Sequence, residues 1–513
     1  MKILLLLTLY FFAFTHVYAE RPNIIMIVGD DIGFSDIGAY GSEISTPNLD
    51  KLADKGMRFR QFNNMSKCNP TRSSLMTGLY TEQPGAYCFV QKMREAGYHT
   101  MFAGKQHLDP WVPKKVFAKN SFDRWFESPF SAFMIKKDGG YPQYNRDDRR
   151  ALFELNGTML DVTELETTQP FHKTDATSDY ALKFLDEAKT LDKPFFMYVA
   201  YHAAHFPLHA TPKDIAKYRD VYREGWDEIR KQRFAKQQRL GIVKNQTRLS
   251  EVSRNINQTR QPSKEDFLEK RKQSMYHRPW KDLTELERDD LSLEMAVFAA
   301  MVDRMDQNIG RVIDKLEEMG VRENTLILFF SDNGSCPYDF NRSYEYPPGV
   351  PEGYRSLSAA WANVGNTPFR YYKQYGHRGG MSTHLIANWP HEIKAGIFSD
   401  RLSHVIDLAP TMMDLARIDK KQYQDLPGLS LVKEFKSEPS PQHEFIFGGY
   451  EGFYAYQEGD WKIIQVNSEV DKWQLYNIKN DPTEIENLAS KFPQRVQDLL
   501  INMKQRQELP EIL

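Results

Sequence analysis

Short apolar runs alternate with helical patterns along the first four hundred residues of the chain. Four of the runs have the length of buried strands and cover residues 23–28, 99–103, 195–200 and 325–330. Between residues 291 and 319, apolar side chains recur at steps of three and four, which predicts a long amphipathic helix. Strands that alternate with helices indicate an α/β domain around a buried sheet.

The pattern shortens after Leu429. Four segments are typical of short strands between Gly, Asp and Asn turns, namely residues 445–448, 453–457, 461–466 and 473–478. A terminal helix is predicted for residues 485–506. We therefore expect an N-terminal catalytic domain over 20–428 and a C-terminal subdomain over 429–513, built from a small antiparallel sheet and a helix.

Residues 212–290 differ from their surroundings because they are rich in Arg, Lys and Gln. We interpret them as a charged helical excursion over the sheet. The simpler explanation of this composition is that the charged side chains face solvent; the alternative is that they bind a polyanionic substrate.

The first nineteen residues have the three parts of a secretory signal peptide. Lys2 gives a positive start, residues 3–14 are apolar, and Val17-Tyr18-Ala19 is a small-residue cleavage site. We predict an exported protein, periplasmic or secreted in a bacterium and secreted or lysosomal in a eukaryote. The rest of the chain holds no apolar stretch of bilayer length, so we expect no stable membrane insertion.

Charge and cysteine content limit the function further. A net charge of -2 over 513 residues gives no general attraction for nucleic acid, so an anionic substrate must be held by a few placed cations. The three cysteines are Cys68, Cys88 and Cys336. An odd number of cysteines is consistent with one of them serving a purpose other than a disulfide. If that one is Cys68, Cys88 and Cys336 can either pair or stay free.

Polar residues follow the strand-like runs directly. The chain places Asp30 and Asp31, Lys105 and His107, His202 and His205, and Asp332 and Asn333 after the four runs. Ligands bind beyond the carboxyl ends of strands in α/β sheets, so these junctions are expected to meet in one cleft.

The acidic and amide residues among them form a candidate metal site. Asp30, Asp31, Asp332 and Asn333 offer only oxygen ligands, which favours a hard divalent cation over zinc. Calcium fits better than magnesium because its coordination is flexible. Each pair alone is also common as a helix cap or a turn.

The run Cys68-Asn69-Pro70-Thr71-Arg72, continued by residues 73–78, is the most specific motif of the chain. It resembles the maturation signature of type I sulfatases, in particular the arylsulfatases, within the alkaline phosphatase superfamily. In that family a formylglycine-generating enzyme oxidises the cysteine to formylglycine, whose hydrate attacks the sulfate ester. The resemblance implies an alkaline phosphatase-like fold, with a large central mixed β-sheet flanked by helices, and this maturation enzyme as a partner.

The resemblance also implies a role for each candidate residue. Calcium is held by Asp30, Asp31, Asp332 and Asn333 and by the hydrate at Cys68. Lys105, in Gly104-Lys105-Gln106-His107-Leu108, and Lys373, in Tyr371-Tyr372-Lys373, hold the sulfate oxygens. His205 protonates the leaving oxygen, His107 takes the proton of the second hydroxyl, and Arg72 fixes the hydrate.

Two positions depart from the pattern of the family. Arg378-Gly379-Gly380 stands where Glu-Gly-Gly is usual, and His384 stands where proline is usual. No attacking or metal-binding residue is lost, but the substrate specificity of family members cannot be assigned to this chain.

The sequence thus predicts an exported sulfatase for sulfate monoesters, with a sulfated carbohydrate as natural substrate and aryl sulfates as surrogates. Two alternatives remain open. One is a phosphate or phosphonate ester hydrolase of the same superfamily, which usually carries Ser or Thr as nucleophile and a second metal. The other is a non-catalytic glycan-binding relative, in which the cysteine would stay unmodified.

Overall fold

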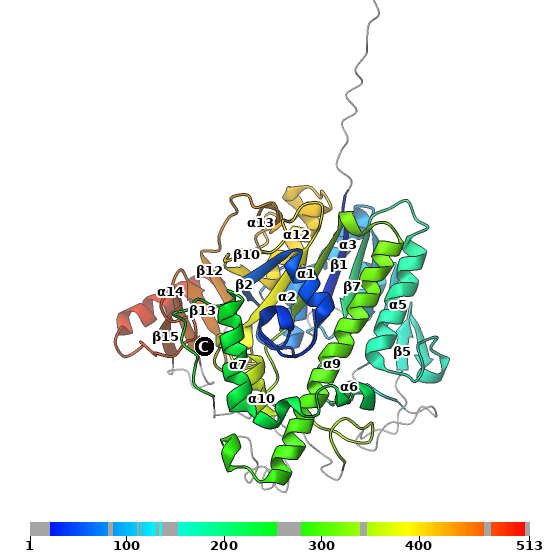
Figure 1. Cartoon of the computed structure of the whole chain (residues 1–513). Helices are drawn as coiled ribbons and strands as arrows, with labels where there is room; N and C mark the ends of the chain where they lie inside the picture. Colours follow the sequence, from blue (N-terminus) through cyan, green and yellow to red (C-terminus); the bar gives the residue numbers. More distant parts are fainter. Residues whose placement is uncertain are drawn as a thin grey trace, which may run out of the picture.

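The computed structural model describes residues 21–80, 86–109, 112, 114–129, 133–135, 152–253, 279–338, 346–465 and 473–507. The predicted signal peptide and residues 254–278 of the charged segment lie outside the described residues. Within them a large mixed sheet is flanked by helices, and a smaller sheet lies beside it (Figure 1).

The large sheet has eleven strands, in the order β10-β2-β9-β8-β1-β7-β3-β4-β5-β6, and β11 pairs with β2. The strands are β1 (Asn23–Gly29), β2 (Met57–Asn63), β3 (His99–Gly104), β4 (Arg124–Glu127), β5 (Leu152–Leu155), β6 (Thr158–Asp161), β7 (Phe195–Ala200), β8 (Thr325–Ser331), β9 (Ser382–Asn388), β10 (Ile397–Ser399) and β11 (Ser403–His404). β8, β1, β7, β3 and β4 are parallel, whereas β9 is antiparallel to both its neighbours. The four predicted strands are confirmed as β1, β3, β7 and β8.

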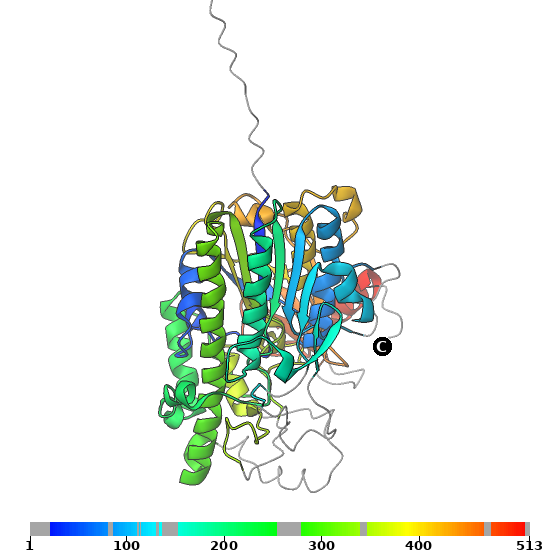
Figure 2. The ribbon, with the colours of Figure 1, turned by 90° about the vertical axis from the view of Figure 1, so that its right-hand side faces the viewer.

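Helices cover both faces of this sheet (Figure 2). The α-helices of the described residues are α1 (Pro47–Asp54), α2 (Cys68–Thr77), α3 (Phe89–Glu95), α4 (Lys114–Ser121), α5 (Lys173–Ala188), α6 (Pro212–Ala216), α7 (Trp226–Arg239), α9 (Glu285–Glu318), α10 (Ser358–Gly365), α11 (Arg378–Met381), α12 (Leu408–Leu415), α13 (Val432–Phe435) and α14 (Pro493–Gln507), of which α14 contacts the smaller sheet. Ile25 and Ile27 of β1 pack in the core that holds α5 and α9, while Met26 and Val28 pack in the core of α2, α3 and α12. Because β1 is buried on both faces, its sequence is a continuous apolar run.

The C-terminal part forms a four-stranded antiparallel sheet, as predicted. Its strands are β12 (Phe445–Gly448), β13 (Ala455–Glu458), β14 (Trp461–Gln465) and β15 (Trp473–Asn477). The predicted start of the last helix at Ile485 is wrong, since α14 begins at Pro493. The Asp481 carboxylate accepts hydrogen bonds from the Ile485 and Glu486 amides and holds this segment in turns instead.

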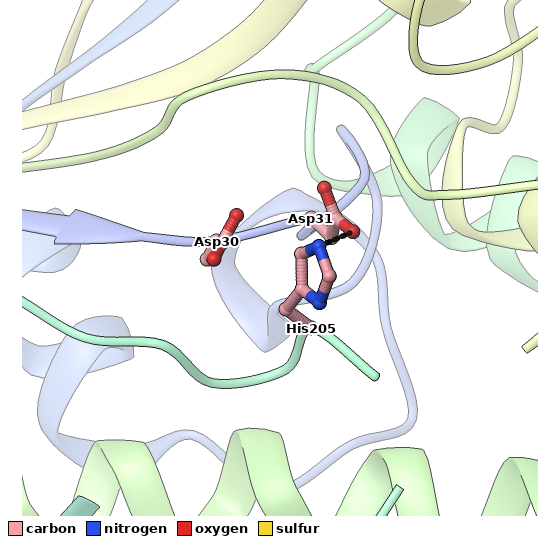
Figure 3. A group of neighbouring side chains, drawn as sticks. All are labelled: Asp30, Asp31 and His205. Atoms are coloured by element: carbon pink, nitrogen blue, oxygen red, sulfur yellow. Dashed lines mark ion pairs between the residues drawn. The ribbon is translucent and has the colours of Figure 1, made fainter. Parts of the chain in front are cut away.

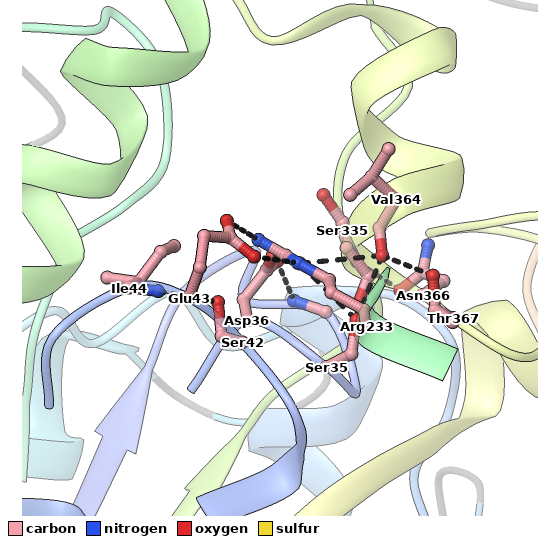
Figure 4. A network of polar contacts seen from close by, with 12 residues as sticks. Ser35, Asp36, Ser42, Glu43, Ile44, Arg233, Ser335, Val364, Asn366 and Thr367 are labelled. Atoms are coloured by element: carbon pink, nitrogen blue, oxygen red, sulfur yellow. Dashed lines mark hydrogen bonds and ion pairs between the residues drawn. The ribbon is translucent and has the colours of Figure 1, made fainter. Parts of the chain in front are cut away.

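The charged segment contains α6 and α7, with turns and irregular structure over residues 240–253, but its interpretation as a solvated face is wrong for Arg230 and Arg233 of α7, which are both buried. The Arg233 guanidinium lies 2.6 Å from Asp36 Oδ1 and 2.7 Å from Glu43 Oε1 (Figure 4). Asp36 Oδ2 in turn accepts a hydrogen bond from the Gly33 amide at 2.8 Å. Arg233 therefore anchors the loop that continues from Asp30 and Asp31.

Replacing Arg233 with methionine is expected to lower the free energy of unfolding by about 3–5 kcal/mol. The variant keeps the apolar stem of the side chain but leaves the buried carboxylate of Asp36 and the half-buried carboxylate of Glu43 without their cation. Urea unfolding followed by circular dichroism measures the effect. Arg239→Met, at an exposed position of the same helix, is the matched control, and equal stability of the two variants would contradict the role of the network.

Candidate active site

The loops that carry the candidate residues meet because their strands end at the same level. Val28 of β1 pairs with Ala200 of β7, and Gly29 pairs with Ser331 of β8. Gly104 at the end of β3 also lies beside Ala200, and a Cβ atom at Gly104 would stand 2.0 Å from the Ala200 carbonyl oxygen. Only glycine allows this close approach.

Backbone hydrogen bonds then join the loops to one another. The Asp30 amide donates to the Ala203 carbonyl at 3.0 Å, and the Ala204 amide donates to the Asp30 carbonyl at 2.8 Å. The Asp332 amide donates to the Gly29 carbonyl at 3.2 Å. The segments after β1, β7 and β8 thus form one rigid edge.

The two acidic pairs come together at this edge, fully buried. Asp31 Oδ1 accepts hydrogen bonds from Asn333 Nδ2, at 2.7 Å, and from Lys373 Nζ. Lys105 Nζ forms an ion pair with Asp30, and Arg72 Nε lies 2.7 Å from Asp332 Oδ2. Three carboxylates therefore face three cationic side chains.

His205 joins this cluster from the loop after β7 (Figure 3). Its Nε2 lies 3.5 Å from Asp31 Oδ2, and its Nδ1 lies 2.7 Å from the Phe206 carbonyl oxygen. Because a carbonyl only accepts, Nδ1 carries the ring proton and Nε2 faces Asp31. Burial lowers the pKa of His205 to about 3.

Three oxygens of the cluster fit a hard cation. Among the described residues, Asp30 Oδ1, Asp31 Oδ2 and Asn333 Oδ1 are buried without a hydrogen-bond partner. Burial and the negative charge of Asp30 raise the pKa of Asp332 to about 6, although Arg72 opposes this shift. A divalent cation among these oxygens would satisfy them and relieve the repulsion, and oxygen-only ligands suit Ca²⁺ or Mg²⁺.

Cys68 is the first residue of α2 and is almost fully buried. Arg72, one turn later, donates to the Lys105 carbonyl at 3.0 Å and to the Tyr198 hydroxyl at 3.2 Å, besides its ion pair with Asp332. Burial disfavours the charge of Lys373, but Asp31 and Cys68 raise the pKa of that lysine well above its usual value. Cys68 therefore lies beside the acidic cluster, and Arg72 fixes its helix there.

Four other histidines, His107, His202, His209 and His377, fall into two groups. His107 is exposed to solvent and has a positive φ of 47°. His202, His209 and His377 are buried, and their rings contact Ser128 Oγ, the Gly353 carbonyl and Gln474 Oε1 respectively. Burial and these contacts thus account for the presence of His202, His209 and His377 without a catalytic role.

Both departures from the family pattern lie in the interior. Arg378 is buried, its guanidinium lies 4.0 Å from the centre of the Phe369 ring, and it donates to the Pro482 carbonyl at 2.9 Å. His384 of β9 stacks on Phe329 with 5.2 Å between the ring centres. Both residues therefore pack within the protein, and Arg378 joins α11 to the C-terminal part.

The structure settles the alternative that the sequence left open for the cysteines. Cys88 and Cys336 are both buried free thiols. Cys336 lies near Asp31 and Lys373, and burial with the charge of Asp31 raises the pKa of its thiol. Neither this thiol nor the hydroxyl of Tyr198 was found from the sequence, since each reaches the site only through the packing of distant segments.

Comparison with known proteins identifies the family. The model of the family described as Sulfatase matches residues 22–418, and that described as N-sulphoglucosamine sulphohydrolase, C-terminal, matches residues 369–510. The chain belongs to the sulfatase family. It is therefore a sulfuric ester hydrolase; such enzymes generally use a metal ion, and this chain has a buried acidic cluster at the end of β1.

Two sequence relatives of this sulfatase are similar over most of their length. One is an uncharacterised sulfatase of Schizosaccharomyces pombe, 29% identical over 94% of this chain and 92% of its own. The other is an arylsulfatase of Klebsiella aerogenes, 30% identical over 82% of this chain and 92% of its own.

A solved structure confirms the fold. It is a protein in complex with its substrate D-glucosamine-2-N,6-O-disulfate, with a TM-score of 0.61 and 22% identity over 95% of this chain and 98% of the other. The predicted α/β fold with a large mixed sheet and a small C-terminal sheet is thus confirmed for the sulfatase. Within the described residues no helix is long and apolar enough to span a bilayer.

Proposed function

We propose that this sulfatase hydrolyses sulfate monoesters of carbohydrates, with formylglycine made from Cys68 and one calcium ion at the acidic cluster. The observation that carries the proposal is the set of unpartnered buried oxygens on Asp30, Asp31 and Asn333 beside the start of α2. Sulfated sugars as substrates are supported by the N-sulphoglucosamine sulphohydrolase match and by the disulfated glucosamine bound to the solved relative.

The acidic cluster would hold the ion through Asp30, Asp31, Asp332 and Asn333, together with an oxygen at position 68. When both groups are present, the hydrated aldehyde supplies an oxygen nucleophile and the ion polarises a sulfate oxygen. Calcium rather than magnesium is proposed because a mixed set of carboxylates and an amide suits flexible coordination.

Lys105 and Lys373 are proposed to bind the sulfate oxygens. Both ammonium groups are buried and bonded to the aspartates of the cluster, so their positions are fixed before substrate arrives. Preorganised cations of this kind stabilise the charge that develops on the transferred group. Arg72 keeps position 68 in place through its bonds to Asp332 and to the Lys105 carbonyl.

The two histidines are proposed to move protons. His205 holds a proton on Nδ1, which leaves Nε2 as the atom that protonates the departing alcohol oxygen. The negative charges of Asp31 and of a bound sulfate ester favour the protonated form of Nε2 that this step needs. His107, which is exposed to solvent, would act as the base that completes turnover.

The direct test is release of sulfate from defined substrates. The chain is coexpressed with a formylglycine-generating enzyme, conversion of Cys68 is checked by mass spectrometry, and sulfate is measured by ion chromatography with a panel of sulfated oligosaccharides and 4-nitrophenyl sulfate. We expect release from at least one sugar sulfate. Converted enzyme that releases phosphate from phosphate or phosphonate esters but no sulfate would overturn the proposal.

Replacing His205 with asparagine is expected to affect substrates according to their leaving group. A sugar alkoxide needs a proton as it departs, so kcat/KM for the sugar sulfate should fall about 10²–10⁴-fold. Nitrophenolate leaves without a proton, so the loss with 4-nitrophenyl sulfate should be clearly smaller. His391→Asn, at an exposed position, is the control, and equal losses on both substrates would contradict the role of His205 as acid.

Export is proposed from the signal-like residues 1–19, with maturation by a formylglycine-generating enzyme in the host. Expression of the full chain in a secreting host, followed by N-terminal sequencing, tests it. A mature N-terminus at Glu20 in the exported fraction is expected.

A further inference from the structure

A cluster of cationic and aromatic side chains that the proposed reaction does not use lies beside Cys68. Lys67 directly precedes Cys68 and is half-buried. Its Nζ donates a hydrogen bond to the Tyr338 hydroxyl at 2.6 Å, and it lies 4.9 Å from the centre of the Tyr338 ring and 5.1 Å from that of Tyr450. The start of α2, the loop after β8 and the loop between β12 and β13 therefore meet at this point.

The tyrosine that supports Lys67 is itself held in place. The Tyr338 hydroxyl donates to Gln374 Oε1 at 2.5 Å, so it accepts from Lys67 and donates to Gln374. Lys373 Nζ lies 5.7 Å from the centre of the same ring. Two ammonium groups, those of Lys67 and Lys373, thus share one aromatic ring.

The charge of Lys67 lacks the anion that the other cations of the site possess. Lys105, Lys373 and Arg72 each form an ion pair with an aspartate. Lys67 forms no ion pair with a carboxylate of the described ranges, and the like-charged Lys373 lies over the same Tyr338 ring. The aromatic rings compensate only part of the cost of removing the Lys67 ammonium group from water. A bound anion would therefore stabilise the charged form of Lys67.

We propose that Lys67 binds a second anionic group of the substrate, a sulfate or a carboxylate carried next to the sulfate ester that is cleaved. The inference rests on the proposed function, because that function places the ester at position 68. Lys67 adjoins this position in the chain, so its ammonium group reaches substituents close to the cleaved ester. Tyr450 offers an aromatic face to the same sugar unit.

The substrate test compares three compounds with one common sulfate ester: a monosulfated glucosamine, the same sugar with a second sulfate, and a monosulfated disaccharide that contains a uronic acid. Lys67→Met keeps the apolar stem over the tyrosine rings and removes the charge. We expect the ratio of kcat/KM for a dianionic over the monoanionic compound to fall at least about tenfold in the variant. The compound that shows the fall identifies the anion as sulfate or carboxylate.

Lys55→Met, at an exposed position, serves as the matched control. Because Lys67 adjoins Cys68, conversion to formylglycine is quantified by mass spectrometry and rates are divided by the converted fraction. An unchanged ratio, or an equal loss on all three compounds, would overturn the inference.

Binding is measured separately in a Cys68→Ala background, which needs no maturation. Titration calorimetry with the same three compounds should show that Lys67→Met weakens binding of a dianionic compound about tenfold more than binding of the monoanionic one. If converted wild-type enzyme releases sulfate neither from these compounds nor from the oligosaccharide panel, the proposed function fails, while calorimetry still decides the role of Lys67. Equal affinities with and without Lys67 would refute that role.

Discussion

Replacing Cys68 with alanine is expected to abolish sulfate release, a loss of at least about 10⁴-fold in kcat. The side chain at the start of α2 is the proposed source of the nucleophile, and alanine supplies no oxygen there. Sulfate release from the best substrate of the panel measures the loss. Cys88→Ala is the matched control, because Cys88 is also a buried free thiol but lies outside the acidic cluster.

Cys68→Ser separates the chemistry of the aldehyde from that of a simple hydroxyl. A serine oxygen can attack sulfur and displace the alcohol, which leaves a serine sulfate ester on the chain. Serine has no second hydroxyl, so this ester cannot be expelled by elimination. We expect at most one slow turnover and a mass increase of one SO₃ group, whereas steady turnover by either Cys68 variant would contradict the mechanism.

Replacing Asp31 with asparagine is expected to remove calcium and activity together. Asp31 is the centre of the cluster, since it contacts Lys373, Asn333 and His205. Burial raises the pKa of Asp31, but Lys373, His205 and Lys105 lower it and together hold it well below its usual range, so the native site contains the carboxylate. Loss of this charge should lower kcat at least about 10²–10³-fold.

Metal content distinguishes this effect from general damage to the fold. Elemental analysis should find about one calcium per chain in the wild type and none in Asp31→Asn. The melting temperature of the wild type should fall when EDTA is added, because bound metal stabilises the native state, and that of the variant should not change. Asp192→Asn, at an exposed position, is the control, and calcium retained by Asp31→Asn would refute the assignment.

The core of the fold can be predicted from local sequence because buried strands and helices need apolar residues in a regular pattern. β1, β7 and β8 are buried on both faces, and their apolar runs predicted them nearly to the residue. Helix α9 was predicted equally clearly, because its apolar residues recur every three or four positions, although in the structure it already begins at Glu285. The start of the last helix was less well predicted, since the turns before Pro493 depend on Asp481 rather than on periodicity.

The candidate site was predicted where its residues are contiguous with these elements. Asp30, Asp31, Asp332 and Asn333 directly follow β1 and β8, two neighbouring parallel strands of the mixed sheet, and this arrangement brings their side chains to one edge. The motif at Cys68 is likewise local, because it occupies the start of a single helix. The roles of these residues stay predictions that the variants above test.

Sequence alone thus determined the family, the strands and the residues at their ends, because each depends on neighbours in the chain. Only the tertiary structure decided that Arg233 is buried against Asp36, that His205 faces Asp31, and that Lys67 lies between two tyrosines. These contacts join segments more than a hundred residues apart. Which residues come into contact there depends on packing and charge in three dimensions, so these contacts cannot be predicted from a local pattern along the chain.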